Sequence, residues 1–116
     1  VSLKNNGGFS SMRYRFNETS VEGYDKAVLK VKGDGKRYQF RVKNSLKEQV
    51  SYKYYFETTG DWQEIEIPLK EMEPTWRGMK PNLPNYQAET MAEIGFLIAN
   101  EKAESFELKI DKVWLK

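Results

Sequence analysis

The chain has 116 residues, a length that fits one domain built around a single hydrophobic core. It contains no cysteine and no histidine, which excludes disulfides, thiolate nucleophiles, imidazole bases and the commonest zinc and copper ligands. The 19 lysine and arginine residues nearly balance the 17 aspartate and glutamate residues, and a net charge of +2 without a basic cluster argues against nucleic-acid binding. No apolar run approaches the roughly 18 residues of a membrane-spanning helix, so we expect no membrane span.

The first part of the chain predicts strands and turns. Short runs of alternating apolar and polar residues, separated by Gly, Asn and Asp, are typical of an all-β fold. The Asn-Asn-Gly-Gly run at residues 5–8 predicts a turn between a strand at residues 1–4 and a strand at residues 9–16, because Asn and Gly tolerate positive φ.

A further strand is predicted at residues 26–32. Ala27, Leu29 and Val31 share one face of it, and Lys26, Lys30 and Lys32 lie on the other. The Gly-Asp-Gly run at residues 33–35 predicts a hairpin turn into the next strand. We favour this over a phosphate-binding loop, because no helix pattern follows to supply N-terminal amides.

The clearest hairpin joins residues 37–43 to residues 50–57 through a turn at residues 44–49. An antiparallel register that pairs Arg41 with Lys53 sets Gln39 opposite Tyr55 and Arg37 opposite Glu57. The apolar residues of both strands then share the inner face: Tyr38, Phe40, Val42, Val50, Tyr52, Tyr54 and Phe56.

The remaining strands lie on either side of a long connection. In residues 62–68, Ile65 and Ile67 point inward, and Pro68 ends the pairing because it lacks an amide donor. Residues 69–89 carry three prolines and predict a long connection with one helical turn at residues 69–72. Strands follow at residues 91–99 and 105–115, and a shift of the apolar phase near Asp111 predicts a β-bulge. Without crossover helices, these strands predict a two-sheet antiparallel β-sandwich, a jelly roll, spanning residues 1–116 as one domain.

Several segments in this order resemble one protein family. They are residues 2–13, the Lys-Gly-Asp-Gly-Lys-Arg-Tyr run at residues 32–38, residues 62–68, Trp76-Arg77-Gly78, residues 94–98 and residues 106–110. Together they cover nearly the whole chain, which resembles the complex I intermediate-associated protein 30 family.

The resemblance implies a galactose-binding-domain-like jelly roll, related in architecture to carbohydrate-binding modules. It implies no cofactor, and in eukaryotes the family includes an assembly factor for mitochondrial NADH:ubiquinone oxidoreductase. The implied location is the bacterial cytoplasm or the mitochondrial matrix. The family has a further N-terminal segment with a strand before the position of Ser2, which this chain lacks, so we expect an open sheet edge.

The tryptophans and one row of polar side chains are the candidate site residues. Trp62 is assigned to the core, as is usual for Trp on a sandwich strand. Trp76 lies in the long connection between Pro74 and Arg77 and is the stronger candidate for a surface role. The polar row offers planar donors beside a tyrosine ring, which suits carboxylate or polyhydroxyl ligands, and consists of Arg13, Arg37, Gln39, Arg41 and Tyr55. A solvated face with Arg37 and Glu57 as an ion pair is the alternative.

No catalytic residue and no metal site is predicted. Glu64 and Glu66 lie on one strand face, whereas catalytic carboxylates face each other across a cleft. No clustered Asp-x-Asp signature for calcium occurs. We therefore predict a non-catalytic binding or assembly module that contacts a protein partner, such as a respiratory-complex subunit, through a sheet face and the proline-rich connection. The alternative is a carbohydrate-binding module that uses Trp76, Tyr55, Arg37 and Arg41.

Overall fold

A computed structural model describes residues 11–77, 79–98 and 108–116 of the chain. Every strand pair in these residues is antiparallel. The elements are β1 (Ser11–Ser20), β2 (Lys26–Lys32), β3 (Arg37–Lys43), β4 (Ser51–Glu57), β5 (Trp62–Pro68), the 3-10 turn η1 (Leu69–Glu71), β6 (Glu73–Thr75), β7 (Thr90–Ile98) and β8 (Lys109–Leu115).

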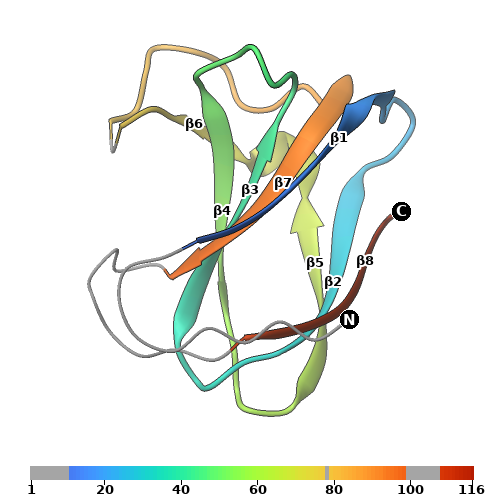
Figure 1. Cartoon of the computed structure of the whole chain (residues 1–116), viewed down its shortest axis with the longest axis vertical. Coiled ribbons are helices and arrows are strands. Elements are labelled where there is room, and N and C mark those ends of the chain that lie inside the picture. The colour runs from blue at the N-terminus through green and yellow to red at the C-terminus, as the bar shows by residue number, and fades with distance from the viewer. Residues whose placement is uncertain (1–10, 78, 99–107) are drawn as a thin grey trace.

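The strands form two packed sheets (Figure 1). A five-stranded sheet has the order β1-β7-β3-β4-β6, and a three-stranded sheet has the order β5-β2-β8. Sequential strands often lie in different sheets, as the cross-connections of a jelly roll require. The predicted two-sheet antiparallel sandwich is therefore confirmed.

The apolar stripes read from the sequence form the core between the sheets. Ala27, Leu29 and Val31 of β2 are each fully buried. On the facing side of the core, Phe40 of β3 and Phe96 of β7 are paired neighbours in the five-stranded sheet, and their buried rings lie 5.4 Å apart between centroids. Alternate residues of a strand lie on the same face. When only one face is buried, the apolar residues in the sequence therefore identify it.

Two local predictions are confirmed residue by residue. In the β3-β4 hairpin, Arg41 pairs with Lys53, Gln39 with Tyr55 and Arg37 with Glu57. In the β2-β8 pair, the register shifts between Lys30 and Val31, whose partners are Lys112 and Ile110, so Asp111 is the extra residue of a bulge.

The Gly-Asp-Gly segment at residues 33–35 was wrongly predicted to close a hairpin. β2 pairs with β5 and β8, whereas β3 pairs with β4 and β7, so these residues carry the chain from one sheet to the other. Gly35 has a φ of +86°, which explains the glycine at this turn. The alternation of apolar and polar residues shows which face of a strand is buried but not which strand lies beside it. The sequence therefore led to the wrong prediction that β2 pairs with β3.

The assignment of Trp62 to the core was also wrong. Trp62 begins β5 and is 46% exposed. It shares the outward phase of Glu64 and Glu66, while Ile67 is fully buried. The strand's own alternation therefore overrides the general preference of Trp for the core.

The long connection contains the predicted helical turn as η1 and an unpredicted strand, β6, which pairs with β4 at the sheet edge. Tyr86 anchors the rest of the connection. Its side chain is fully buried, its hydroxyl donates to the Thr90 carbonyl, and its amide donates to the Met72 carbonyl at 3.0 Å. The Tyr86 ring also packs on Tyr52, with 5.2 Å between centroids.

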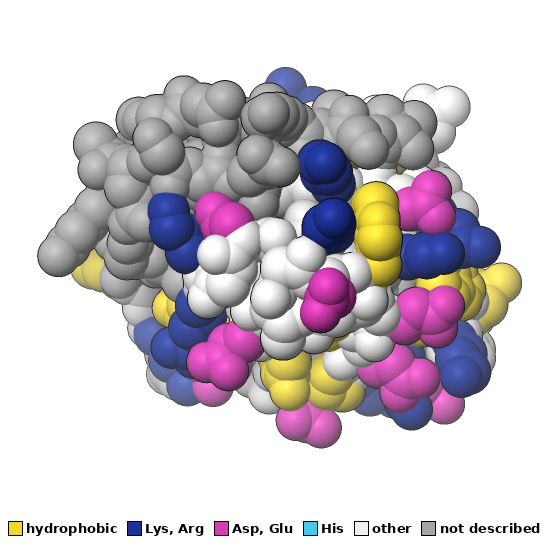
Figure 2. All heavy atoms as spheres, turned by 90° about the horizontal axis from the view of Figure 1, so that it is seen from below, with side chains coloured by type: hydrophobic (Ala, Val, Ile, Leu, Met, Phe, Trp, Pro, Cys, Tyr) yellow, Lys and Arg dark blue, Asp and Glu magenta, His cyan; other side chains and the backbone are white. Residues whose placement is uncertain are grey.

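The predictions for residues 1–10, 99 and 105–107 lie outside the described residues. No helix in the described part of the chain is long and apolar enough to cross a membrane. Figure 2 shows the end of the molecule that carries the β2-β3 and β4-β5 connections, where basic and acidic side chains alternate over the surface. This mixture agrees with the small net charge of +2.

Candidate binding face

The predicted polar row lies on the outer face of the five-stranded sheet. Arg37, Gln39 and Arg41 alternate with the buried Tyr38 and Phe40 along β3, so they have the outward phase. The hairpin register adds Tyr55 of β4 to the same face, directly opposite Gln39.

Arg13 also lies on this face, but its strand is not the direct neighbour of β3 that the sequence led us to expect. Its strand, β1, does not neighbour β3, because β7 lies between them. Gly95 of β7 pairs with Arg13 on one side and with Arg41 on the other. The two arginines therefore lie in one row about 9.5 Å apart at the backbone, with a residue without a side chain between them.

Gln39 lies beneath this face and does not project from it. The residue is only 1% exposed, and its Oε1 accepts a hydrogen bond from Arg41 Nε at 3.0 Å. An amide buried in this way orients the neighbouring guanidinium and is not itself accessible to a large ligand. The alternation of residues along β3 correctly predicted that the Gln39 side chain points to the outer face. It did not predict that the side chain is buried there.

Tyr55 is the centre of a cluster of charged side chains. The Arg37 guanidinium carbon lies 4.3 Å from the ring centroid, and Lys53 Nζ lies 3.2 Å from the Tyr55 hydroxyl. Lys53 Nζ also lies 5.2 Å from the ring centroid, so both cations are within the range of interaction with the electron-rich ring. Arg37, Lys53 and Tyr55 line a polar depression of about 380 Å³, whose other lining residues are Tyr54, Glu71 and Glu73.

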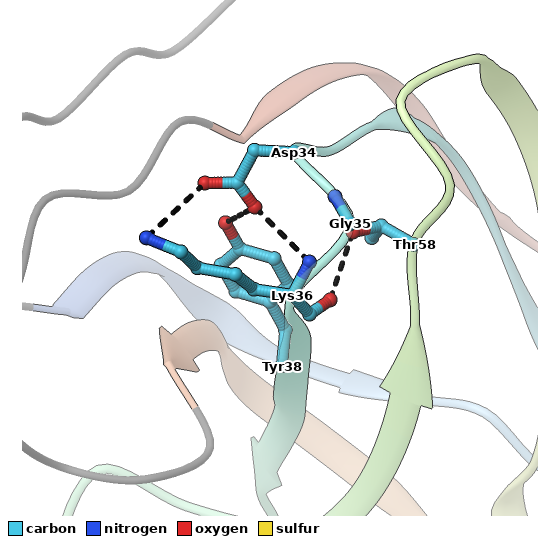
Figure 3. A network of polar contacts seen from close by, with 5 residues as sticks. All are labelled: Asp34, Gly35, Lys36, Tyr38 and Thr58. Atoms are coloured by element: carbon cyan, nitrogen blue, oxygen red, sulfur yellow. Dashed lines mark hydrogen bonds and ion pairs between the residues drawn. The ribbon is translucent and has the colours of Figure 1, made fainter.

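A network of polar contacts fixes the start of β3 beside the end of β4, and so holds Arg37 near Tyr55 (Figure 3). Thr58 Oγ1 donates to the Lys36 carbonyl at 2.8 Å and accepts from the Gly35 amide at 3.1 Å. Asp34 Oδ1 accepts from the Tyr38 hydroxyl at 2.8 Å. The Lys36 ammonium lies 3.8 Å from Asp34 Oδ2.

Trp76 and Arg77 form a separate corner of the molecule. Trp76 is half-buried, Arg77 is exposed, and the Arg77 guanidinium carbon lies 5.2 Å from the Trp76 ring. Reciprocal backbone hydrogen bonds of 3.0 and 2.9 Å between Trp76 and Met79 close a tight turn, in which Arg77 has a φ of +50°. Thr75, the neighbour of Trp76, pairs with Ser51, four residues or about 13 Å along β4 from Tyr55. The structure therefore does not bring Trp76 into the Tyr55 cluster.

Two acidic side chains of the three-stranded sheet, Glu66 and Asp111, form ion pairs with lysines. Glu66 accepts from Lys26 Nζ at 2.9 Å and lies 3.5 Å from Lys116 Nζ. The hydrogen bond and charge of Lys26 lower the pKa of Glu66, and the same pair raises the pKa of Lys26. Among the described residues, no group of three or more acidic, His or Cys side chains is arranged to hold a metal ion.

Sequence reasoning missed part of this face. Lys53 was recognised only as the partner of Arg41, and neither Glu71 nor Glu73 was singled out. Both glutamates belong to the long connection, and only the pairing of β6 with β4 places Glu73 opposite Lys53. The length of the connection was the available signal, because long connections in small domains are often functional.

This two-sheet antiparallel sandwich is a galactose-binding-domain-like jelly roll, the architecture of many binding modules. The chain belongs to the complex I intermediate-associated protein 30 family, whose model matches residues 1–110, so the resemblance read from the sequence is confirmed. A comparison with curated proteins gives no match.

Two similar solved structures are family 11 carbohydrate-binding modules from Clostridium thermocellum. The module of the cellulosomal cellulase Lic26A-Cel5E has a TM-score of 0.70 and 17% identity over 98% of this chain and 72% of its own. The module in complex with a β-1,3-1,4-mixed-linked tetrasaccharide has a TM-score of 0.68 and 17% identity, over 98% of this chain and 73% of its own. At this identity the likeness shows a shared fold.

Proposed function

We propose that this domain is a non-catalytic binding module that contacts a protein partner through the outer face of its five-stranded sheet. The observation that carries the proposal is the Tyr55 cluster, in which a tyrosine ring lies among two cations and two carboxylates. The family name associates its founding member with an intermediate of complex I, so a respiratory-complex subunit is the partner class that we propose.

The composition of the cluster suits a protein interface. Tyrosine and arginine are enriched among the residues that dominate binding energy at protein interfaces. Arg37 is held near the ring by the contacts around Thr58, so it loses less conformational freedom on binding than a free arginine does. Charges of both signs around Tyr55 match a partner that also carries both, and they fix its orientation.

The Trp76-Arg77 corner extends the proposed contact. A standard interface covers about 800 Å² on each partner, which is enough to include Tyr55 and a corner whose neighbour Thr75 pairs with Ser51, about 13 Å along β4 from Tyr55. In this arrangement Tyr55 is the main anchor and Trp76 a second one. Arg13 and Arg41 line the sheet face on the other side of Gln39 and add charge to it.

The test is co-purification of tagged domain variants from the native host, with complex I subunits measured quantitatively. We expect Arg37→Glu and Tyr55→Ala each to reduce recovery of the bound subunit at least tenfold. Lys47→Glu is the matched control, because Lys47 is an exposed cation in the β3-β4 turn, and it should leave recovery unchanged. Equal recovery with all three variants, or recovery of no subunit by the unsubstituted domain, would refute the proposal.

A carbohydrate-binding module is the second candidate. The depression of about 380 Å³ beside Tyr55 offers one ring, two cations and two carboxylates, which are groups that bind hydroxyls. The module of similar fold that holds a mixed-linked tetrasaccharide supports this alternative. It ranks second because Trp76, the other predicted sugar-stacking ring, lies outside the depression.

Calorimetry with mixed-linked β-glucan oligosaccharides separates the two candidates. Sugar binding that is abolished by Tyr55→Ala but not by Trp62→Ala would favour the carbohydrate reading. Trp62 is the matched control because it is an exposed aromatic residue on the other sheet.

A further inference from the structure

The inner face of β1 carries two aromatic side chains that the opposite sheet does not cover. Tyr14 pairs with Ile94, a residue that packs against the core, so Tyr14 has the inward phase. Tyr14 and Phe16 nevertheless remain 37% and 38% exposed. Their exposure follows from the unequal sheets, since the described part of the three-stranded sheet ends at β8.

An apolar groove lies between β1 and β7 of the five-stranded sheet and β8 of the other sheet. Its volume is about 310 Å³, the space of about ten water molecules. Water against apolar walls is released favourably when an apolar side chain replaces it. The groove is lined by Tyr14, Phe16, Ile94, Phe96, Ile110 and Val113, with Asp111 as the charged residue of the described lining.

The edge beside the groove can accept another strand. Among the described residues β1 pairs only with β7, so its other edge has backbone N–H and C=O groups directed away from the sheet. Such an edge is a template for pairing with an extended segment of another chain.

The charges beside this edge select the kind of segment. Arg13 and Arg15 have the outward phase on β1, on either side of the inward Tyr14. A strand added to β1 would place alternate side chains in the groove and the others beside these arginines. Opposite charges on neighbouring strands are favourable, so acidic residues fit the outward positions. Arg15 already shows this preference, because its Nε lies 2.9 Å from Glu93 Oε1 on the strand at the other side.

We propose that the β1 edge and its groove bind an extended segment of a protein partner, which adds to the sheet as a further strand. The segment carries apolar side chains at every second position and acidic side chains between them. The inference shares with the proposed function the premise that the partner is a protein and the side chain of Arg13, whereas the groove and the Tyr55 cluster lie on opposite faces of the five-stranded sheet.

The test is selection of a displayed library of random 12-residue peptides on the folded domain. We expect enrichment of peptides that alternate apolar and acidic residues. A selected peptide should bind Phe16→Lys at least tenfold more weakly and Arg13→Glu at least fivefold more weakly. Tyr24→Lys is the matched control, because Tyr24 is an aromatic residue that is 44% exposed and lies outside the groove lining.

Two further measurements keep the test decisive. Amide chemical shifts of the labelled domain should change along β1 when the peptide binds, and Arg37→Glu should leave peptide affinity unchanged. Circular dichroism checks that Phe16→Lys folds, and Arg13→Glu serves in its place otherwise. No enrichment, selected peptides without the alternation, or equal binding to Phe16→Lys overturns the inference. A concentration-dependent dimer that Phe16→Lys abolishes also overturns it, because the occupant is then a second copy of the chain.

Discussion

Gly33 and Thr58 lie so close together that a Cβ atom at residue 33 would overlap Cβ, Oγ1 and Cγ2 of Thr58. This contact lies where the chain leaves the three-stranded sheet and enters the five-stranded sheet. Thr58 also forms the hydrogen bonds that hold Gly35 and Lys36 at the start of β3. The position of Arg37 beside Tyr55 therefore depends on a glycine four residues earlier in the chain.

Gly33→Ala should destabilise the domain by about 2 kcal/mol or more, because atoms of a packed threonine must shift to admit the methyl group. Gly35→Ala is the control. A Cβ at residue 35 meets nothing within 4 Å, and its φ of +86° costs about 1 kcal/mol, so its effect should be smaller. Urea unfolding measures both free energies. An equal or smaller effect of Gly33→Ala would contradict the close contact.

Thr58→Val should cost about 1 to 3 kcal/mol of stability. The substitution keeps the shape of the side chain but removes the donor to the Lys36 carbonyl and the acceptor of the Gly35 amide, at a residue that is only 5% exposed. Thr58→Ser retains the hydroxyl and should cost less. Thermal unfolding compares the two variants, and the prediction fails if valine is tolerated as well as serine.

Much of the fold was predictable because buried and exposed residues alternate along a strand, so the sequence shows which residues face the core. The inward residues of β2, β3 and β4 and the register of the β3-β4 hairpin all follow from alternation and a short turn. The bulge at Asp111 was predictable for the same reason, since an extra residue shifts the apolar phase. The partner of β2 was not predictable, because alternation carries no information on which strand lies beside another.

The candidate site was predictable only in part. Phase placed Arg37, Gln39, Arg41 and Tyr55 on one face, and the register of the hairpin then set Gln39 opposite Tyr55. Burial of Gln39 and the approach of Glu73 depend on contacts between segments far apart in the sequence. The exposed aromatic residues of β1 depend on the unequal width of the two sheets, which no local pattern encodes.

Trp62→Ser should change stability by no more than about 0.5 kcal/mol, because the side chain is 46% exposed at the start of an outer strand. Phe40→Ala is the contrasting variant. Phe40 is fully buried against Phe96, so its truncation should cost about 3 to 5 kcal/mol. Denaturant unfolding measures both. If Trp62→Ser lowered the free energy of unfolding nearly as much as Phe40→Ala, Trp62 would have to be part of the core.

Stability should fall as the pH rises above about 10, and Tyr86 should account for part of the fall. Burial, and to a lesser extent the neighbouring Tyr52, raises the pKa of Tyr86 well above its ordinary value of 10.0. Between the two pKa values the unfolded chain has lost the phenol proton and the folded chain retains it. The unfolded state then binds fewer protons, so the free energy of unfolding decreases with pH until the pKa of the folded state is reached.

Tyr86→Phe isolates this contribution. The variant lacks the hydrogen bond to the Thr90 carbonyl and should be about 1 kcal/mol less stable at neutral pH. Its further loss of stability between about pH 8 and about pH 11 should nevertheless be smaller than that of the unsubstituted domain, because residue 86 no longer titrates. Urea midpoints at the two pH values give each loss, and equal losses in the Tyr86→Phe variant and the unsubstituted domain would mean that Tyr86 ionises as readily in the folded state as in the unfolded chain.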